Sequence, residues 1–321
     1  MKKFDVIALG ELLIDFTSSG VSSQNNPMFE ANPGGAPCNV LSMLSKLGKK
    51  TSFIGKVGND AFGVQLEKAI VECGIDSTYL RKDDNVHTTL AFVQTLEGGD
   101  RDFSFYRNPG ADMMLTAEEV PCDAIADSKI FHFGTLSMTH EGVREATKKA
   151  IKAAEEAGNI ISFDPNLRPP LWNSLEEAKE QVLYGLAHCD ILKISDNEIQ
   201  WLTGEEDFTK GVEWIRSRFN DIKLILVSMG GEGSRAYYNN GMVEVAPFLQ
   251  DTTIETTGAG DTFGACVLNY VCENGLDNLS EDNLKEMLTF ANAAASIVTT
   301  RKGALRVMPT KEEVEALIAT R

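Results

Sequence analysis

The sequence has no run of 18 or more apolar residues, which is the length that a membrane-spanning helix needs. Positive charge is also scarce, because 30 Lys and Arg stand against 47 Asp and Glu, for a formal net charge of −17. Nucleic acids and anionic membranes bind basic surfaces, so we expect neither as a partner. Met1-Lys2-Lys3 leads directly into a short apolar strand. We therefore expect no signal peptide and a cytoplasmic location.

Paired metal-binding motifs are absent as well. The four histidines show neither H-x-x-H nor H-E-x-x-H spacing, so a zinc enzyme is not expected. The six cysteines form no C-x-x-C pair and mostly lie in apolar runs, at positions 38, 73, 122, 189, 266 and 272. This distribution is typical of reduced core cysteines in a cytoplasmic protein.

The composition is that of a globular protein, with 43% hydrophobic and 24% charged residues over 321 positions. Short apolar strands alternate with helices, which is the pattern of a parallel sheet with helical cover. Strands are predicted at 4–9, 51–57, 129–135, 160–164, 190–194 and 224–229, and helices at 37–47, 61–73, 141–157, 175–188, 208–219 and 288–299. We therefore predict one α/β domain over residues 1–321, with a mostly parallel sheet covered by helices on both faces.

The stretch from Asp251 to Val271 joins a polar start, rich in Thr and Gly, to apolar residues at the spacing of a buried helix face. A helix is predicted to begin at or near residues 258–261, where Gly258, Ala259 and Gly260 leave backbone N–H groups uncovered. Such amides form a site for an anion such as a phosphoryl group. Asp261 lies one step inside this site. It either complements the helix dipole or accepts a proton from a hydroxyl that attacks the phosphoryl group.

Two segments near the N-terminus are candidates for binding a hydroxylated ligand. Asp15 is the single acid of an otherwise apolar extended segment, either through simple strand alternation or because it binds a hydroxyl or a cation. Residues 32–37 are predicted to form a turn, in which Gly34 and Gly35 let a ligand approach the backbone. Asn39, on the helix that follows, offers a donor and an acceptor to a polyol.

Residues 87–96 and 102–106 alternate with period two around Glu97-Gly98-Gly99-Asp100-Arg101, which predicts a β-hairpin. We expect it to pair with the extended segments on either side of residue 20. The result is a small β lid, inserted from roughly residues 12–33 and 87–107, that covers a sugar cleft and excludes water. The exposed edge of this lid can pair with its copy in a homodimer.

Three residues of the lid are candidate substrate contacts. Phe92 and Phe105 either face the substrate or pack against other aromatic side chains of the hairpin. Arg107, at the exit of the hairpin, is a candidate contact to a hydroxyl or a phosphate.

Polar motifs follow three predicted strands, at residues 164–168, 193–198 and 228–233. The carboxyl ends of parallel strands meet at one edge of a sheet, where such folds bind ligands. Arg168 offers a fork of donors for a phosphate or a pair of sugar hydroxyls, and Glu198 can act through water on Mg²⁺. The glycines of the third motif leave room for a nucleotide to lie on the backbone.

Over nearly the whole chain, these motifs resemble the PfkB (ribokinase-like) family of carbohydrate kinases, and within it the bacterial fructokinases. Residues 34–63 are similar to the N-terminal signature of the family, and Thr256-Thr257-Gly258-Ala259-Gly260-Asp261-Thr262-Phe263 is similar to the C-terminal one. Shorter pieces at 10–16, 108–112 and 164–168 resemble the fructokinases. The resemblance implies a ribokinase-like fold and an enzyme that uses ATP, Mg²⁺ and, at a second cation site, K⁺. The reaction expected from it is phosphorylation of D-fructose to fructose 6-phosphate.

The resemblance also implies roles for individual residues. Asp261 is the implied catalytic base, with Gly258, Ala259 and Gly260 as the anion hole. Sugar contacts are implied at Asp15, Gly34, Gly35 and Asn39, and nucleotide contacts at Lys193, Ser228, Gly230, Gly233 and Asn292. Glu198 matches the Glu of a family N-x-x-E motif, with Ser195 in place of its Asn. A potassium site is implied at Thr257, Arg301 and Gly303, where Glu255 replaces the usual Asp.

Two alternative functions stay open at this point. The first is a kinase of the same family for another sugar, such as ribose or 2-keto-3-deoxygluconate. The second is a sugar-binding regulatory protein without catalysis. The intact segment from Gly258 to Asp261 favours a kinase over the regulatory protein.

Overall fold

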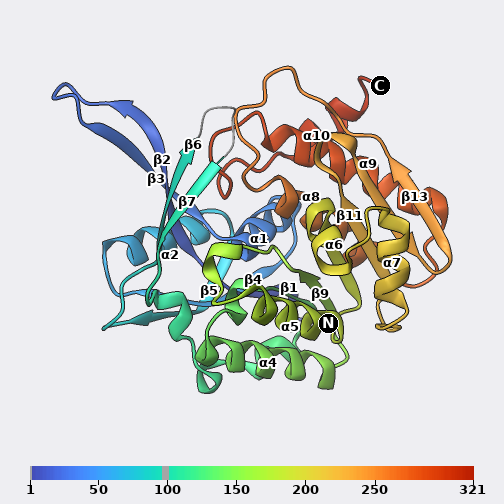
Figure 1. Ribbon diagram of the computed structural model, residues 1–321, viewed down its shortest axis with the longest axis horizontal. Helices are drawn as coiled ribbons and strands as arrows, with labels where there is room; N and C mark the ends of the chain where they lie inside the picture. The colour runs from blue at the N-terminus through green and yellow to red at the C-terminus, as the bar shows by residue number, and fades with distance from the viewer. Residues whose placement is uncertain (1, 96–100) are drawn as a thin grey trace.

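The computed structural model of the protein describes residues 2–95 and 101–321, so residues 97–100 of the predicted hairpin loop lie outside the described residues. A sheet of nine strands runs through the molecule in the order β13-β12-β11-β10-β9-β8-β1-β4-β5 (Figure 1). Neighbouring strands are parallel from β11 to β5, whereas β12 and β13 form an antiparallel hairpin at one edge. The strands are β1 (Phe4–Leu9), β4 (Thr51–Gly58), β5 (Ile75–Asp83), β8 (Ser128–Gly134), β9 (Ile160–Asp164), β10 (Ile191–Ser195), β11 (Leu224–Ser228), β12 (Ser234–Tyr238) and β13 (Gly241–Val245).

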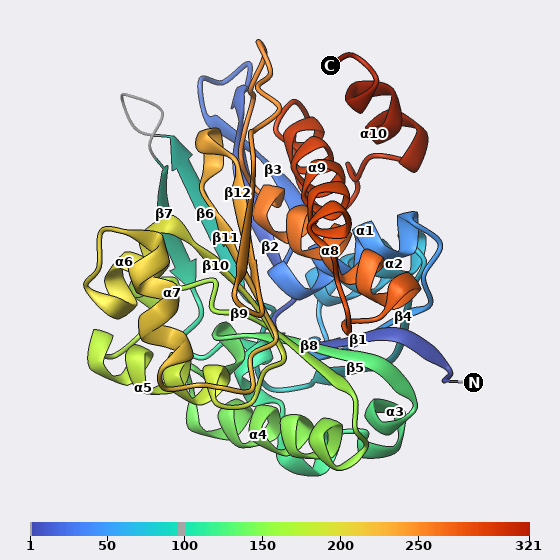
Figure 2. The same cartoon turned by 90° about the vertical axis from the view of Figure 1, so that its right-hand side faces the viewer.

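Helices cover both faces of this sheet, as Figure 2 shows with the sheet seen nearly edge-on. Alternate residues of β1 enter two separate cores, because Val6 and Ala8 pack on one face and Ile7 and Leu9 on the other. The first core is closed by α1 (Ala36–Lys46), α2 (Ala61–Glu72), α8 (Ala259–Asn274), α9 (Glu281–Val298) and α10 (Lys311–Ile318). The second is closed by α3 (Cys122–Ala126), α4 (Glu141–Glu156), α5 (Leu175–Leu186), α6 (Asp196–Thr203) and α7 (Phe208–Arg216). The predicted α/β fold, mostly parallel and covered on both faces, is confirmed.

A second, four-stranded sheet stands to one side of the main body in the order β3-β2-β6-β7 (Figure 1). It consists of β2 (Leu13–Val21), β3 (Pro27–Gly34), β6 (Leu90–Thr95) and β7 (Arg101–Tyr106). The β2 strand pairs antiparallel with β3 and parallel with β6. Both of its chain segments therefore leave the large sheet and return to it.

Several elements differ from the prediction. The expected turn at residues 32–37 is partly strand, because β3 runs to Gly34 and α1 starts two residues later. The polar strand β5, the hairpin of β12 and β13, and the short helices α6 and α10 were not predicted. Within residues 2–95 and 101–321, no helix combines the length and the apolarity that crossing a bilayer demands.

Candidate active site

Helix α8 starts where the sequence predicts, and its N-terminus is built around Gly258. Gly258 is the N-cap residue and has φ 78°, a left-handed conformation that favours glycine. An added Cβ would also lie 2.8 Å from the Cβ of Ala304. The first-turn amides of a helix have no intrahelical acceptor. The turn at Gly258 therefore presents them to an anion, together with the positive end of the helix dipole.

Asp261 lies in the first turn of α8 and is 9% exposed. Its Oδ2 accepts a hydrogen bond of 2.8 Å from Nδ2 of Asn39, on α1. Burial raises the pKa of Asp261, while the Asn39 hydrogen bond and the charges of Lys193 and Arg168 oppose this rise. The carboxylate is thus oriented by an amide and held near two cations. The Oδ1 atom of Asn39 is buried and has no hydrogen-bond partner in the described part of the chain.

A cavity of about 330 Å³, here called the first cavity, opens in front of Asp261. It brings together side chains that the sequence places up to 250 residues apart, from Glu11 to Asp261. Of the predicted site residues, those that line it are Asp15, Gly35, Asn39, Phe105, Arg168, Lys193, Thr257, Gly258, Gly260 and Asp261. Gly34 lies beside it, where any side chain would collide with the Asp15 carboxylate.

Asp15 is the second carboxylate of the first cavity. Burial raises its pKa to about 7, the charge of Arg168 opposes this rise, and Glu255 and Asp261 add to it. A carboxylate in this environment lacks the water that would solvate it elsewhere. It is therefore well suited to accept hydrogen bonds from ligand hydroxyls.

Lys193 supplies positive charge at the inner end of the first cavity. Its Nζ lies 2.9 Å from Oδ2 of Asp164, and both side chains are buried. Burial alone would lower the pKa of Lys193, but the charges of Asp164, Glu198 and Asp261 raise it. A Cβ at Gly260 would lie 3.1 Å from Nζ. The ammonium group therefore lies against the start of α8, where it adds to the attraction for an anion.

A second cavity of about 300 Å³ adjoins the first. Thr256 and Gly260 line both cavities, so the two meet at the N-terminus of α8. The predicted residues that line the second cavity are Ser228, Gly230, Gly233, Ala259 and Asn292. Lys193, which was expected with this group, lines the first cavity near the point where the two meet.

Asn292 holds one wall of the second cavity together. Its Nδ2 donates to the carbonyl oxygens of Val245 (3.1 Å) and Ala246 (3.2 Å), and its Oδ1 accepts from the hydroxyl of Ser234 (2.9 Å). Both polar atoms of the amide are therefore used within the protein.

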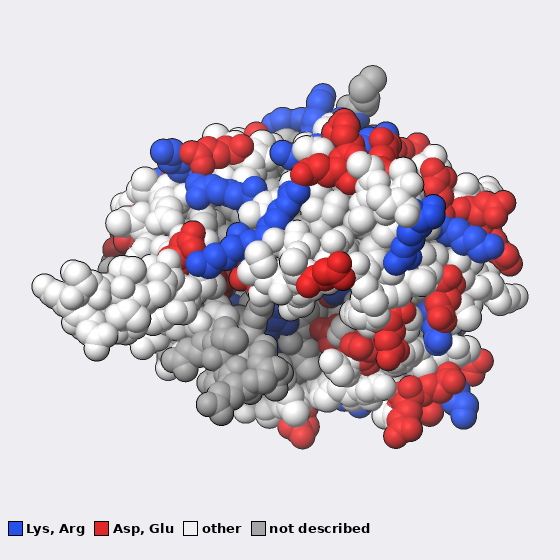
Figure 3. Space-filling view, turned by 90° about the horizontal axis from the view of Figure 1, so that it is seen from above, with Lys and Arg blue, Asp and Glu red and all other residues white. Residues whose placement is uncertain are grey.

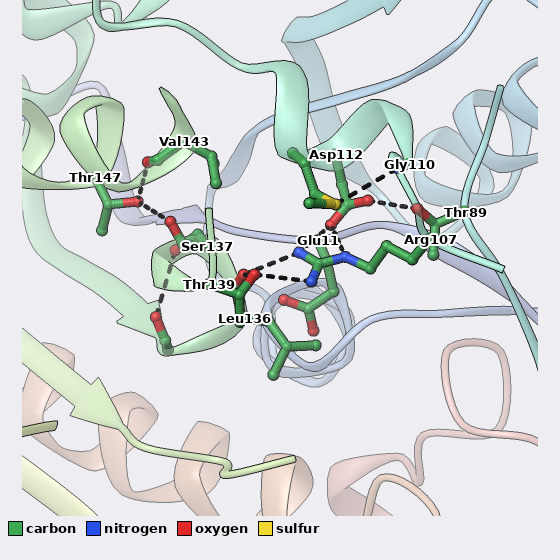
Figure 4. A network of polar contacts seen from close by, with 12 residues as sticks. Glu11, Thr89, Arg107, Gly110, Asp112, Leu136, Ser137, Thr139, Val143 and Thr147 are labelled. Carbon is green, nitrogen blue, oxygen red and sulfur yellow. Dashed lines mark hydrogen bonds and ion pairs between the residues drawn. The ribbon is translucent and has the colours of Figure 1, made fainter. Parts of the chain in front are cut away.

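Arg107 corrects one prediction, because it does not line the first cavity. Its guanidinium is buried and pairs with Asp112, with Nε and Nη2 at 2.8 and 2.6 Å from Oδ2. Further hydrogen bonds run to the hydroxyl of Thr139 (2.8 Å) and the carbonyl of Leu136 (2.9 Å). Figure 4 shows this network between the exit of β7 and the segment after β8. The guanidinium thus ties the small sheet to the large one and lines neither cavity.

Phe92 also lies outside the first cavity, and the second of the two alternatives holds for it. Its ring stacks on Phe16 with a centroid distance of 4.8 Å and meets Phe29 and Tyr106 edge-on. Phe105, on the neighbouring strand β7, does line the cavity.

The predicted metal contacts are placed as follows. Glu198 lines neither cavity; its Oε1 accepts from the amide of Leu167 (2.7 Å) and its Oε2 from Ser195 (2.8 and 2.9 Å).

Thr257 and Gly303, two of the residues predicted to bind K⁺, line a small pocket of about 20 Å³ with Glu255, whose Oε1 accepts from the Gly303 amide at 2.9 Å. The side chain of Arg301 points away from that pocket, to the carbonyl of Val307 and the carboxylate of Glu313.

Residues that the prediction missed also line the cavities. Among them are Glu11, Leu136 and Asn166 in the first cavity, and Phe248, Leu249 and Gln250 in the second. Asn166 belongs to the motif at residues 164–168 that the rule for the edge of a parallel sheet singled out, although it was not named as a contact; Glu11 follows the carboxyl end of β1, where the same rule applies. Residues 248–250 lie in a loop with no such signal.

The face seen from above carries Lys and Arg side chains interspersed with Asp and Glu (Figure 3). No single basic field covers it. A face without a basic patch agrees with the net charge of −17. The groups that can bind an anion are therefore those inside the cavities.

The chain is similar to known proteins over nearly its whole length. A family model described as pfkB family carbohydrate kinase matches residues 3–311. A protein of Arabidopsis thaliana named probable fructokinase-4 is 41% identical over 318 residues, which cover 98% of this chain and 96% of that protein. The structure of fructokinase from Xylella fastidiosa with bound ATP has a TM-score of 0.89 at 29% identity and covers 98% of both chains. A fructokinase double mutant from Vibrio cholerae O395, in fructose, ADP and potassium ion bound form, has a TM-score of 0.87 at 27% identity over 99% of both chains.

Proposed function

Because this chain belongs to the pfkB family of carbohydrate kinases, we propose that it phosphorylates D-fructose with ATP to give fructose 6-phosphate. The fold is the ribokinase-like fold that the sequence predicts. One observation carries the proposal: two cavities of similar volume meet at the N-terminus of α8, beside the carboxylate of Asp261. The relatives named fructokinases support fructose as the acceptor.

The sugar occupies the first cavity and the nucleotide the second. The oxygen of the sugar 6-hydroxyl attacks the γ-phosphorus of ATP, and the bond from that phosphorus to the bridging oxygen of ADP breaks. Asp261 accepts the hydroxyl proton, and ADP leaves with the electron pair of the broken bond. The backbone amides at Gly258, Ala259 and Gly260 bind the oxygens of the phosphoryl group during transfer.

The environment of Asp261 supports the role of a general base. Its raised pKa makes the carboxylate more basic than an exposed one. The hydrogen bond from Asn39 fixes its orientation, and the ammonium group of Lys193 lies against Gly260, beside the amides that bind the phosphoryl group in this proposal. Asp15 and Arg168 bind further sugar hydroxyls, with Gly34 and Gly35 leaving room for the ring.

ATP is expected to bring Mg²⁺, which neutralises the charge of its phosphate groups when bound. Mg²⁺ usually keeps several waters and takes one or two protein carboxylates. Oε2 of Glu198 accepts two hydrogen bonds from Ser195, whereas Oε1 accepts one, from Leu167, and keeps a lone pair for a metal-bound water. Glu198 thus fits a contact through water. Glu255 and Thr257 present oxygen atoms to the small pocket beside Gly303, which suits K⁺ there.

The small sheet is proposed to act as a lid that excludes water from the first cavity, into which it projects Phe105. The single-domain organisation, a homodimer through the lid edge and the cytoplasmic location stay predictions.

Asp261→Asn tests the assignment of the base. The substitution keeps the shape of the side chain and the contact with Asn39, but removes the proton acceptor. We expect kcat to fall by about 10²–10⁴, with KM for fructose within a few-fold of the wild type. Asp277→Asn, the same change at an exposed position beyond the other end of α8, is the matched control. Phosphorylation by Asp261→Asn at the wild-type rate would remove Asp261 from the mechanism.

A coupled assay for ADP release over a panel of sugars tests the choice of substrate. Fructose should give the highest kcat/KM of a panel with ribose, 2-keto-3-deoxygluconate and fructose. Turnover of another sugar with fructose inert would leave the kinase reaction in place and replace its substrate.

A further inference from the structure

Glu11 is a buried carboxylate that the mechanism above does not use. It follows the carboxyl end of β1, is 4% exposed, and lines the first cavity. Its Oε1 accepts a hydrogen bond of 2.8 Å from the amide of Ala36, the first residue of α1. A buried carboxylate is costly unless its oxygens are hydrogen-bonded or paired with a cation. Its partners therefore decide what it does.

The nearest cation does not neutralise Glu11. Figure 4 shows the Glu11 carboxylate beside the guanidinium of Arg107, with no dashed line between them. The ion pair and hydrogen bonds of Arg107 go to Asp112, Thr139 and Leu136 instead. In the part of the chain that the structure describes, no Lys, Arg or His lies within ion-pair distance of Glu11.

The electrostatic environment of Glu11 fits a carboxylate with incomplete partners. Burial raises its pKa to about 7, the amides of Glu11 and Ala36 lower it, Asp112 raises it and Arg107 lowers it. An ionised carboxylate has about four acceptor positions. The two backbone amides leave acceptor capacity on the cavity side.

Glu11 lies away from the end of the first cavity where the phosphoryl group is transferred, as the residues that this cavity shares with its neighbours indicate. Thr256 and Gly260 also line the second cavity, so they mark the end where the phosphoryl group is transferred. Glu11, Leu136 and Asn166 instead line a small pocket on another side, with Gly134 and Asp164. The charges that shift the pKa of Glu11 are those of Arg107 and Asp112, whereas Asp15 responds to Arg168, Glu255 and Asp261. The two carboxylates therefore face different parts of the ligand.

We propose that Glu11 is a specificity-determining residue, whose carboxylate accepts a hydrogen bond from a sugar hydroxyl remote from the one that is phosphorylated. This inference rests on the proposed function, because it requires a polyhydroxylated acceptor in the first cavity. Glu11 completes a set of acceptors around that ligand, with Asp15 on the small sheet and Asp261 on α8. With a sugar that lacks this hydroxyl, the Glu11 carboxylate stays buried with only the amides of Glu11 and Ala36 as partners.

A purely structural role for Glu11, as an anchor for the start of α1, is the competing explanation. Glu11→Gln separates the two, because the Gln carbonyl oxygen can still accept from Ala36 while its amide turns a donor toward the sugar. Glu119→Gln is the control: the Glu119 carboxylate also accepts from a backbone amide, that of Thr116 at 2.9 Å, but it pairs with Lys56 at 2.7 Å and does not line the first cavity.

The test compares three enzymes, the wild type, Glu11→Gln and Glu119→Gln, with kcat and KM measured for fructose and for each of its monodeoxy analogues. We expect Glu11→Gln to raise KM for fructose by about 10-fold or more, which is the range of a hydrogen bond to a charged group, with KM for ATP within 2-fold. For one analogue, the wild type should lose about 10-fold in kcat/KM, and the Gln variant should lose less than 3-fold. Glu119→Gln should match the wild type throughout.

Equal losses in wild type and Glu11→Gln for every analogue would overturn the role of Glu11, and so would an unchanged KM for fructose. Absence of fructose turnover by the wild type would instead refute the proposed function, and the two failures are thereby distinguished. Glu11→Asp is the second variant should Glu11→Gln not fold. It keeps the charge but withdraws the carboxylate by one methylene, and the same loss of discrimination is expected.

Discussion

Replacing Asp112 by Asn should leave the guanidinium of Arg107 buried without a counter-charge. The exposed fractions of the two side chains are 3% and 2%, and Oδ2 of Asp112 receives both Nε and Nη2. Removing one partner of a buried ion pair costs about 3–5 kcal/mol. For a chain of 321 residues, a loss of about 4 kcal/mol corresponds to a fall of about 6 °C in Tm. Urea denaturation, followed by circular dichroism, measures the change in the free energy of unfolding.

The double variant Arg107→Met/Asp112→Leu removes both charges together. Its cost should be much smaller than the sum of the single variants, because no buried charge is left unpaired. Arg235→Met is the control, since the Arg235–Glu244 pair has a similar distance of 2.7 Å but side chains that are 25% and 48% exposed. That change should stay below about 1 kcal/mol. The reasoning fails if Asp112→Asn costs no more than Arg235→Met, or if the two single costs simply add in the double variant.

Further predictions concern the start of α8 and the buried charges. Gly258→Ala should lower both kcat and Tm, because Gly258 has φ 78° and an added Cβ would meet the Cβ of Ala304. Gly264→Ala, in the same helix, has open space for its Cβ and should raise the free energy of unfolding by about 0.5–1 kcal/mol. The opposite order of the two variants in thermal denaturation would contradict this. Lys193→Met should lower kcat by about 10²-fold or more, and a rate within 3-fold of the wild type would exclude the ammonium from the transfer. Since the pKa of Glu11 rises from 4.5 to about 7 on folding, its contribution to stability is complete below about pH 4.5 and is lost as pH rises through 7. Between pH 5 and pH 8 the wild type should therefore lose about 3 kcal/mol relative to Glu11→Gln; parallel stability curves in urea titrations would refute it.

The features that the sequence predicts well are those with local signals. The start of α8 is marked by Gly258 and Gly260 before an apolar face, and the structure places it within one residue of the prediction. The buried strands β1 and β9 match their predicted bounds, because short, mostly apolar runs end at a glycine or an acid. These signals depend only on residues within one element.

Two missed elements carried a usable signal. Residues 234–245 form the hairpin of β12 and β13, and Asn239 at its turn has φ 49°. Two β-rich segments around Asn-Asn-Gly are a strong hairpin signal, and the carbonyls of Val245 and Ala246 at its exit hold Asn292. The strand β5 carries a weaker signal, because its burial alternates irregularly along a polar edge of the sheet.

The prediction for Arg107 failed for a different reason. An Arg at the mouth of a candidate cleft is equally compatible with a ligand contact and with an internal ion pair. The choice depends on Asp112, five residues away, and on Leu136 and Thr139 from the segment after β8. Only the tertiary arrangement brings these groups within hydrogen-bond distance, so no pattern in the sequence distinguishes the two roles.

An acidic protein that binds a polyanion needs an explanation, because a net charge of −17 should repel ATP. At physiological ionic strength, charges on the surface are screened beyond about 8 Å, and Figure 3 shows acids and bases interspersed there. The groups that we propose to meet the phosphates lie inside, where screening is weak. Lys193 is buried against Gly260, and the amides of α8 carry the positive end of the helix dipole. The cavity therefore attracts the nucleotide over a few ångströms, and raised salt should weaken its binding far less than it would weaken binding to an exposed basic patch.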